Sequence, residues 1–550
     1  MFLQISASIA GDFFLSMDNR QRAAIDSAFY GIQYHTHVFD AEDARRKLAP
    51  LQLKYVRIWA RPETFHPDSA TWQWADLDAR ISEVRQAGYR PFVCLYQSEE
   101  WWGATGDDPW WNHSRFVEEW RKSAAQLTLR YRGEVAGFII FDEINILHPD
   151  KGYYISPKGA ADLYLQAARQ IKQIDSTLLC GGPSNFGGWE NGYWANLVLQ
   201  EPDGAQMLDF VSSNLFLSWN ADDPDSLLLD RTLWYEEAPQ KIKEMLGKKT
   251  PLLMLDAYNV SALWQKDGVL WTDPRNTNFF GGIYQALALL HAAQGGFAIT
   301  LHWETLGGYG IFDWYPQFNP LPPYFAWNFV EQVAGLRSGA RVLSFATDLP
   351  VKQNVQHHGG MNAPSYRVQP FVVRVPDGTL RCSLINKSNT RVDTAHILTP
   401  DSVKSVTIYR YDSLHADAQS YEPLATMPAA DTTSVLCPPM SVTVVSFSTQ
   451  EPHGLFANSP RLLPRAEVHI WPNPFNARAR LVYRLPEASP IVLKIFDVHG
   501  RRVSLKTVDW QTAGLHSIVL NAMHWASGIY FVRLDSPKGW SARSKFILLK

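Results

Sequence analysis

The chain has 550 residues, of which 46% are hydrophobic and 19% are charged, and its formal net charge is -3 at pH 7. This composition is typical of a folded, soluble protein with a large core, and the length predicts roughly two to four domains. The absence of a basic excess argues against a nucleic-acid partner. No stretch reaches the roughly 18 apolar residues of a membrane span, so we expect no transmembrane segment.

Short apolar runs alternate with amphipathic helical stretches over residues 1–336. Runs of this kind suit strands buried on both faces of a parallel sheet, with helices between them. Eight such units predict an α/β fold in the form of a closed (β/α)8 TIM barrel. An open doubly wound sheet is the alternative, but no Gly-x-Gly-x-x-Gly or phosphate-binding loop motif occurs. The strands are expected near Tyr30–His35, Tyr55–Trp59, Pro91–Tyr96, Ala136–Asp142, Leu178–Gly182, Leu208–Ser213, Leu252–Asp256 and Gly296–His302.

Acidic residues end two of the predicted barrel strands. Asp142 and Glu143 follow one apolar run, and Asp256 ends another. The carboxyl ends of barrel strands carry the chemistry of this fold, and glycoside hydrolysis uses two carboxylates placed there. We therefore predict that Glu143 is a catalytic acid/base and that Asp256 is its partner. The alternative is that these acids only end strands and meet solvent.

A basic residue, Arg57, lies within the second predicted strand. A buried Arg needs a carboxylate partner because an unpaired buried charge is unfavourable, and Asp256 is the expected partner. The alternative is a surface Arg at a strand end. His35 and His37 suggest a metal site, but no third ligand has suitable spacing, so we expect no metal and no other cofactor. The strand-end candidates for sugar contact are His35, His37, His302, Trp303 and Glu304.

Aromatic residues are abundant, with 21 Trp, 22 Tyr and 28 Phe. Many of the Trp residues fall in segments that we interpret as loops, and the flat face of Trp is suited to stacking on sugar rings. Each one taken singly is expected to be a packing residue. As a group around one barrel face they favour a carbohydrate cleft, in which we place Trp102.

The character of the sequence changes after residue 336. Short alternating runs with Pro, Asn, Asp and Gly between them predict a β-sandwich accessory domain over residues 337–449. Residues 450–464 have the composition of a linker, and residues 465–550 form a further all-β, immunoglobulin-like domain. The four Cys residues lack C-x-x-C spacing, which argues against zinc or redox chemistry. Cys94 and Cys180 are expected to be buried thiols, and pairing of Cys382 with Cys437 stays open.

Five motifs follow one another along the predicted barrel. They are Arg130-Tyr-Arg-Gly, Phe138-Ile-Ile-Phe-Asp-Glu-Ile-Asn, Cys180-Gly-Gly-Pro-Ser, Asp209-Phe-Val-Ser-Ser-Asn and Gly307-Gly-Tyr-Gly-Ile-Phe. Their order and spacing resemble those of the retaining glycoside hydrolases of clan A, and most closely family 39, which includes β-xylosidases. The resemblance implies that Glu143 is the acid/base, that Asp256 stands at the nucleophile position with Arg57 as its partner, and that Trp303 is a platform for the sugar.

The chain departs from the family pattern at three places. Asp142 replaces an Asn that would bind a sugar hydroxyl, Asp256 replaces a Glu, and Asn214 and Phe216 stand where His and Tyr are usual. The shorter Asp256 side chain retracts its carboxylate by about 1.5 Å, at a site where a misplacement of ~1 Å can slow catalysis ~100-fold. Retention is favoured, and inversion stays open. A carboxylate at Asp142 also raises the pKa of Glu143, which helps it to act as an acid.

The C-terminal segment carries a second set of motifs. They are Trp471-Pro-Asn-Pro-Phe-Asn, Leu481-Val-Tyr-Arg-Leu-Pro, Ile495-Phe-Asp-Val-His-Gly, Ala513-Gly-Leu-His and Ser527-Gly-Ile-Tyr-Phe-Val-Arg-Leu. These resemble the type A sorting domain of the type IX secretion system. The resemblance implies a bacterial protein that is secreted or held at the outer-membrane surface, with the secretion machinery as a partner. A generic β-sandwich accessory domain is the alternative. The first ten residues are apolar but lack a basic region, so they match a signal peptide poorly.

Together these features predict a secreted glycoside hydrolase with a carbohydrate substrate, a poly- or oligosaccharide of the β-xylan or β-glucan type. The first alternative is a catalytically inactive barrel that binds glycans at the cell surface. A polysaccharide lyase is a weaker alternative, because no basic cluster suited to a uronate is evident. The two main hypotheses differ in whether Asp256 faces Glu143 across a cleft.

Overall fold

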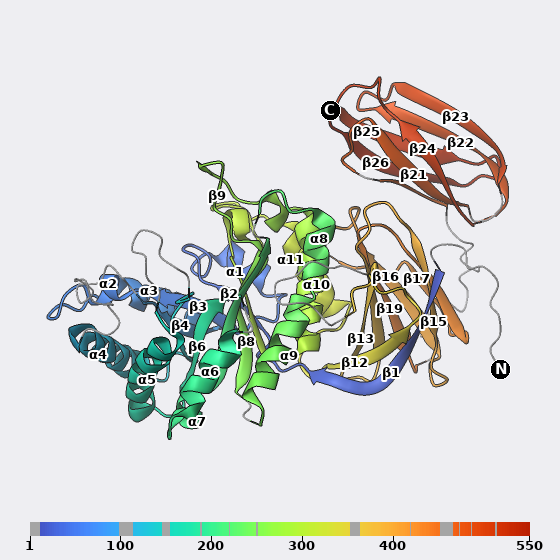
Figure 1. The fold of residues 1–550 in the computed structure, drawn as a ribbon. Helices are drawn as coiled ribbons and strands as arrows, with labels where there is room; N and C mark the ends of the chain where they lie inside the picture. The colour runs from blue at the N-terminus through green and yellow to red at the C-terminus, as the bar shows by residue number, and fades with distance from the viewer. Residues whose placement is uncertain are drawn as a thin grey trace.

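Eight parallel strands close into a barrel (Figure 1), in the order β11-β2-β3-β4-β5-β6-β7-β8. This confirms the predicted closed barrel and excludes the open sheet. The computed structural model describes residues 12–97, 114–145, 155–187, 190–218, 220–248, 251–352, 364–418, 420–450, 466–471, 473–485, 487–511 and 514–550. The barrel strands are β2 (Tyr30–Gln33), β3 (Tyr55–Ala60), β4 (Arg90–Leu95), β5 (Gly137–Ile140), β6 (Leu179–Phe186), β7 (Phe210–Ser218), β8 (Leu252–Ser261) and β11 (Ile299–His302).

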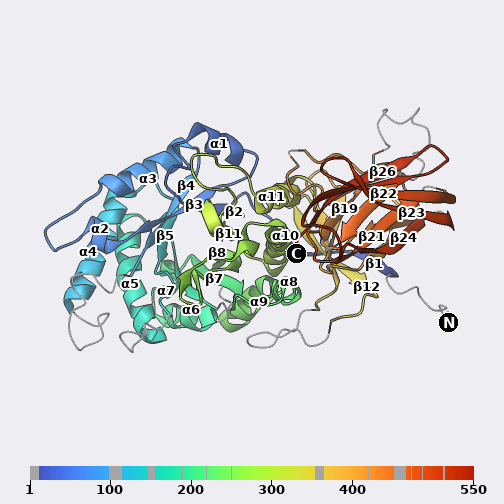
Figure 2. The same cartoon turned by 90° about the horizontal axis from the view of Figure 1, so that it is seen from above.

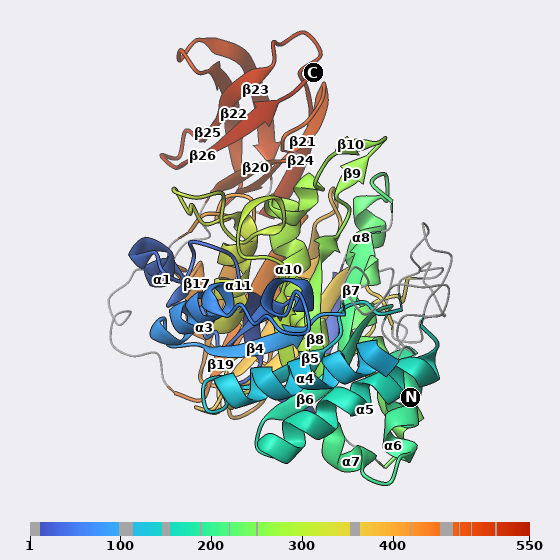
Figure 3. The same ribbon diagram turned by 90° about the vertical axis from the view of Figure 1, so that its left-hand side faces the viewer.

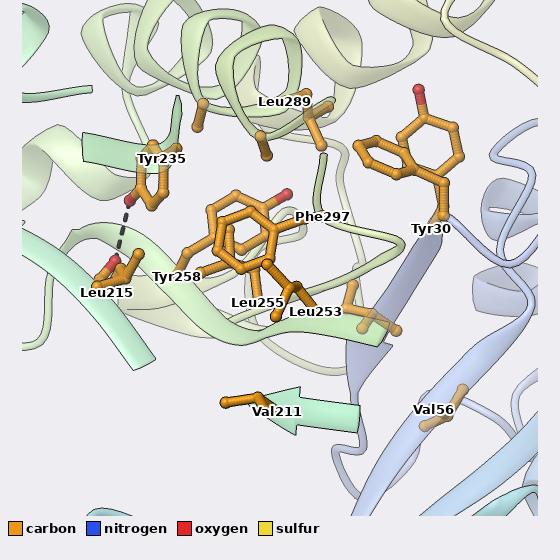
Figure 4. Packing of buried hydrophobic residues seen from close by; sticks show 14 of the residues in the cluster. Tyr30, Val56, Val211, Leu215, Tyr235, Leu253, Leu255, Tyr258, Leu289 and Phe297 are labelled. Carbon is orange, nitrogen blue, oxygen red and sulfur yellow. Dashed lines mark hydrogen bonds between the residues drawn. The ribbon is translucent and has the colours of Figure 1, made fainter. Parts of the chain in front are cut away.

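Helices cover the outside of the barrel, as the view from above shows (Figure 2), and α4, α5 and α6 lie next to one another (Figure 3). Strand residues alternate between the two sides of the barrel wall. Leu253 and Leu255 of β8 pack outward with Leu289 of α10 (Figure 4), whereas Met254 faces the lumen. The helices are α1 (Glu42–Leu48), α2 (Pro62–Phe65), α3 (Ala75–Gln86), α4 (Ser114–Tyr131), α5 (Pro157–Ile174), α6 (Glu190–Gln200), α7 (Gly204–Met207), α8 (Asp225–Arg231), α9 (Trp234–Leu246), α10 (Phe279–Gly295) and α11 (Pro322–Gln332).

Helix α10 lies between the barrel and a second sheet (Figure 1), and every residue from 280 to 295 is buried. A helix that is apolar on all sides needs a partner on each side. Strand β8 and helices α9 and α11 lie against it from the barrel, and β1 and β19 lie against it from the second sheet. A Cβ atom at Gly282 would come within 2.3 Å of the Tyr411 hydroxyl, so the close approach of the two layers requires glycine there.

The second sheet has nine strands, in the order β17-β16-β19-β14-β13-β12-β1-β15-β18. Its edge strand β18 also contacts β14, so the sheet folds over a core of its own. The prediction that residues 1–336 all belong to the barrel is wrong for β1, which pairs with β12 and β15 instead. The strands are β1 (Asp12–Ala24), β12 (Arg341–Thr347), β13 (Val368–Arg374), β14 (Leu380–Asn386), β15 (Asp393–Leu398), β16 (Ser405–Tyr411), β17 (Ala425–Pro428), β18 (Thr432–Cys437) and β19 (Ser441–Ser448).

The C-terminal strands form two further sheets around a separate core. All four cysteines precede this domain. They are buried and unpaired, so Cys382 and Cys437 form no disulfide. The first C-terminal sheet holds β20 (Glu467–Trp471), β21 (Arg478–Leu485) and β24 (Gly514–Asn521), and the second holds β23 (Arg502–Gln511), β22 (Ser489–Asp497), β25 (Gly528–Asp535) and β26 (Ser541–Leu548). A two-stranded hairpin, β9 (Gln265–Lys266) and β10 (Val269–Leu270), follows β8.

The place of β1 in the second sheet predicts the effect of a single truncation. Leu15 is 1% exposed in the core of that sheet. We expect Leu15→Ala to lower the free energy of unfolding by about 2–5 kcal/mol, because it leaves a cavity. Arg20→Ala, on an exposed side chain of the same strand, should change it by less than about 0.5 kcal/mol. Urea denaturation measures both, and equal effects would contradict this assignment of β1.

Candidate active site

The lumen of the barrel changes from apolar to charged along strand β3. Tyr55, Arg57 and Trp59 alternate with outward residues and therefore point inward. Tyr55 belongs to an apolar cluster with Phe92 and Met254 at the floor. Arg57 is the next inward residue, so its charge is placed between that floor and the mouth of the barrel.

Arg57 is bonded to two carboxylates, and its side chain has no exposed surface. Its Nη2 atom lies 2.7 Å from Asp142 Oδ1, and its Nη1 atom lies 3.4 Å from Asp256 Oδ2. Nη1 also donates to the Asp256 carbonyl at 3.3 Å. The predicted contact with Asp256 is therefore present, and Asp142 is the nearer partner. One guanidinium compensates both acids, as a buried charge requires.

Asp256 sits in a bulge of β8. Ser213 of β7 pairs with Leu255 and Asn214 pairs with Ala257, so Asp256 is the extra residue between them. Bulges re-aim side chains next to functional sites. The predicted strand end at Asp256 is wrong, because β8 continues as far as Ser261.

The carboxylate of Asp256 is wholly buried. The Ser184 hydroxyl donates a short hydrogen bond to Oδ2, whereas Oδ1 has no partner. Ser184 is itself the extra residue of a bulge in β6, with a left-handed φ of 56°. Burial raises the pKa of Asp256 to about 6, and the charge of Arg57 opposes that rise. As it stands, Asp256 is a support of the site and is not open to a ligand.

Asp142 and Glu143 lie at the mouth end of β5 and share one amide donor. Asn214 Nδ2 donates to Asp142 Oδ1 at 3.0 Å and to Glu143 Oε1 at 3.2 Å. Trp59 Nε1 donates to the other oxygen of Asp142 at 3.1 Å. The Gln97 side chain accepts from the Asp142 backbone N–H at 2.9 Å and donates to the Asp142 carbonyl at 2.5 Å. Both carboxylates are thus held in fixed positions.

Glu143 is half-buried at the mouth end of β5. Burial raises its pKa to about 7, the charge of Asp142 adds to that rise, and the hydrogen bond from Asn214 opposes it. Its backbone N–H donates to the Ser184 carbonyl at 3.0 Å, which ties the acid to the bulge of β6. A carboxyl group with a raised pKa beside an acid bound to Arg57 is suited to giving a proton.

Aromatic rings surround the mouth next to these acids. The Trp303 ring lies 4.9 Å from Trp59 and 6.4 Å from Phe216, centroid to centroid. Glu304 follows Trp303, and burial raises the pKa of its carboxyl to about 7. Both of these predicted site residues are partly exposed.

The histidines are placed differently from one another. His35 lies 6.1 Å from the Trp314 ring, and His37 lies 4.8 Å from the Tyr315 ring, in the loops beside β2 and β11. The prediction that His302 contacts a sugar is wrong. Its side chain is 1% exposed and packs outward between Tyr258 and Trp327, because Leu301 takes the inward position.

The remaining predictions concern Trp102, a metal site and a membrane span. Trp102 lies outside the described residues. Among the described residues, no group of three His, Cys, Asp or Glu side chains is arranged to hold a metal ion. No helix in the described part of the chain has the length and apolar character of a membrane span. Ser184 and Gln97 were not among the predicted site residues. A polar residue inside a buried apolar strand is a signal that could have marked Ser184, and Gln97 is one of the polar residues that follow the third predicted strand.

The double pairing of Arg57 predicts a non-additive effect on stability. Arg57→Met leaves two acids without a counter-charge and should lower the free energy of unfolding by about 3–5 kcal/mol. Adding Asp256→Asn should recover part of that loss, since it removes one of the uncompensated charges. Arg61→Met, on a side chain 49% exposed, is the control. Strictly additive losses in urea denaturation would contradict the shared pairing.

Residues 469–549 match the family described as "Secretion system C-terminal sorting domain". No curated protein matches the sequence. Among solved structures, one similar protein is CelM2, a bifunctional glucanase-xylanase protein from a metagenome library. It is 14% identical over 79% of this chain and 99% of its own, with a TM-score of 0.56.

Two further structures give the same likeness. The GH51 arabinofuranosidase from Xanthomonas axonopodis pv. citri is 13% identical over 80% of this chain and 99% of its own, with a TM-score of 0.57. The family 44 xyloglucanase from Paenibacillus polymyxa is 11% identical over 80% of this chain and 100% of its own, with a TM-score of 0.55. The chain thus combines a fold found in clan A glycoside hydrolases with a type IX secretion sorting domain, which directs it to the cell surface or the medium.

Proposed function

We propose that the chain is a secreted glycoside hydrolase that cleaves O-glycosidic bonds, with Glu143 as general acid/base. The observation that carries this proposal is the placement of Glu143 beside Asp142 at the mouth end of β5, where Asn214 Nδ2 donates to both carboxyl groups and burial raises the pKa of Glu143 to about 7. Catalytic acids work best when their pKa lies near the working pH. A surface acid that only ends a strand would not be expected to have its pKa raised by burial and a neighbouring carboxylate.

Glu143 gives its proton to the glycosidic oxygen of the leaving group. Asn214 holds the Glu143 carboxyl, and Asp142 lies beside it, bound to Arg57 and Trp59. In this arrangement Asp142 Oδ2, whose one donor among the described residues is Trp59, accepts from a sugar hydroxyl. Binding that hydroxyl is the task of the Asn that Asp142 replaces. The rings of Trp59 and Trp303 form the wall against which the sugar stacks.

Asp256 is our candidate for the second carboxylate of the reaction. It has no exposed surface, so it reaches the sugar only if substrate binding opens its contacts with Ser184 and Arg57. Attack by Asp256 itself would retain the anomeric configuration, with carboxyl groups roughly 5–5.5 Å apart. Activation of a water would invert it, at roughly 6.5–9.5 Å. We favour retention, and the anomer that forms first decides between the two.

The substrate class that we favour is a β-xylan or β-glucan. CelM2 is described as a glucanase-xylanase, and another similar structure is a β-xylosidase from Caulobacter crescentus, 15% identical over 81% of this chain and 100% of its own, with a TM-score of 0.53. Export places the chain where such polysaccharides occur. The exposed rings of Trp314 and Tyr315 beside the mouth also suit a chain of sugars.

A glycan-binding barrel without catalytic activity is the second candidate, and the full burial of Asp256 favours it. In that case Arg57, Asp142 and Asp256 would form a structural network beneath a sugar-binding surface. Glu143 would then be a hydrogen-bonding group for a sugar hydroxyl. The two candidates predict different results for the same experiment.

We expect Glu143→Gln to lower kcat/KM by about 10²–10⁴-fold on a panel of xylans, β-glucans and aryl glycosides, because it removes the proton donor. Asp256→Asn should lower it comparably if Asp256 acts on the sugar. Glu331→Gln is the matched control, since Glu331 is also a buried acid with a raised pKa but lies on α11. Product release measures kcat/KM, and NMR identifies the anomer that forms first. If no substrate is turned over and glycan binding is intact, the hydrolase proposal is wrong and the glycan-binding barrel is supported.

The pH profile tests the acid separately. Glu143 acts in its protonated form, so kcat/KM should fall as the pH rises through about 7. If Asp256 is the partner, which acts in its ionised form, kcat/KM should also fall as the pH drops through about 6. Asp142→Asn removes a negative charge next to Glu143, so the alkaline limb should move to lower pH. A limb that stays in place would show that another group supplies the proton.

A further inference from the structure

A cavity of about 500 Å³ lies where the barrel meets the second sheet. Helices α8 and α10 (Figure 1) form its barrel side, loops of the second sheet form the other side, and Asn473 and Pro474 of the C-terminal domain complete the lining. Its lining contains none of Asp142, Glu143 and Asp256, so it is separate from the candidate active site. This volume falls within the roughly 300–1,000 Å³ typical of small-molecule sites.

Three basic side chains from separate loops of the second sheet line this cavity, and they are Lys352, Arg367 and Lys387. Val368 of β13 pairs with Asn386 of β14, so Arg367 and Lys387, the next residues outside that ladder, leave the sheet at the same end. Lys352 follows β12, which pairs with β13 on its other side. The sheet thus assembles a basic cluster that no run of basic residues marks in the sequence.

Two of these basic residues share one carboxylate. Lys387 Nζ lies 2.7 Å from Asp230 Oδ1, and Lys352 Nζ lies 2.8 Å from Asp230 Oδ2. Lys387 is 3% exposed, and burial lowers its pKa to about 8. Within the described part of the chain, two ammonium groups on one acid leave a positive charge without a counter-charge, which is unfavourable at a buried position. A negatively charged ligand in the cavity would compensate that charge.

Arg367 adds a donor that is open to such a ligand. Its Nε and Nη2 atoms donate to Asp393 at 2.9 Å and 2.6 Å, and its Nη1 atom has no partner among the described residues. Asp225 is the acidic residue of the described lining, but its side chain is 59% exposed and lies 3.5 Å from Arg275. The charge of Asp225 is therefore screened by solvent and opposed by a cation of its own.

The rest of the lining suits a sugar ring. Asn278 accepts a backbone hydrogen bond through its side-chain oxygen, and Ser388 accepts two. The amide hydrogens of Asn278 and the hydroxyl hydrogen of Ser388 therefore remain to be donated to a ligand. Phe279 lies between them and Leu229 in the chain's lining of the cavity and is half-buried. Polar donors beside an apolar surface match the hydroxyl edge and the C–H face of a sugar.

We propose that this cavity binds a uronate, a sugar unit that carries a carboxylate, within a polysaccharide. The carboxylate binds to Lys352 and Arg367 and compensates the charge that Lys387 shares with them, and the ring packs against Phe279. Helices α8 and α10 follow β7 and β8, so their first turns lie at the mouth end of the barrel, which also carries Glu143. This binding function goes beyond the proposed hydrolysis and does not depend on it.

Calorimetry of the full chain with three probes tests the chemistry of the ligand. Methyl glucuronoside carries both the ring and the carboxylate, methyl glucoside carries the ring alone, and acetate carries the carboxylate alone. We expect methyl glucuronoside to bind at least about 10-fold more tightly than either of the others, because it alone makes both the charge-assisted and the ring contacts. Equal binding of the two sugars, equal binding of methyl glucuronoside and acetate, or no binding of methyl glucuronoside would overturn the inference.

Variants test the position of the site. Lys352→Met should weaken binding of methyl glucuronoside about 10-fold, since it removes one charge-assisted contact. Lys404→Met is the matched control, on an exposed lysine of the same domain outside the lining, and should leave binding unchanged. Asn389 is an exposed residue of the lining, so Asn389→Asp should weaken binding and Asn389→Lys should strengthen it. If Lys352→Met unfolds, the two Asn389 variants decide, and folded variants that leave binding unchanged would overturn the inference.

Two active-site variants separate this inference from the proposed hydrolysis. Trp303→Ala and Glu143→Gln should both leave the binding of methyl glucuronoside unchanged, because neither residue lines the cavity. Loss of binding in Trp303→Ala would place the uronate in the active site and overturn the inference. Failure of the hydrolysis appears instead as a wild type without turnover, which leaves the calorimetric result as it stands.

Discussion

The buried guanidinium of Arg57 is the contact on which the candidate site depends. It is the counter-charge of two acids that come from different strands, Asp142 on the β5 side and Asp256 on β8. A positive charge below and an apolar floor beneath it set the electrostatics of the whole mouth. Burial raises the pKa of Glu143, and the neighbouring charge of Asp142 adds to that rise. Burial is the main cause of the raised pKa, and the charge of Arg57 itself opposes that rise.

Two bulges give this network its geometry. Ser184 in β6 and Asp256 in β8 are each the extra residue of their strand, and they bond to one another although β7 lies between the two strands. A regular strand would turn one of each pair of neighbours outward into the helix layer. The bulges allow polar groups to converge in a lumen that is otherwise filled by apolar side chains.

The sequence was sufficient to predict the barrel, because continuous apolar runs with helices between them have few other solutions. It was also sufficient for Arg57 and its need for an acid. It could not reveal which residues are bulged, since a register shift depends on the neighbouring strand. For this reason Asp256 was expected at a strand end. His302 was expected in the cleft because it ends a predicted strand, whereas Leu301 takes the inward position and turns His302 outward. The pairing of β1 with strands more than three hundred residues away was equally out of reach, because local patterns carry no information on distant partners.

The position of β1 has a consequence for the order in which the chain can take shape. Met17 leaves the ribosome early, but its partner Phe345 is made only after the entire barrel. Until then β1 is a strand without a sheet, and the side of α10 that faces β1 and β19 has nothing against it. Late pairing of this kind slows folding and prolongs the exposure of apolar surface. Formation of the second sheet is therefore the last step of folding. It pairs β1 with β12, the strands that precede and follow the barrel segment.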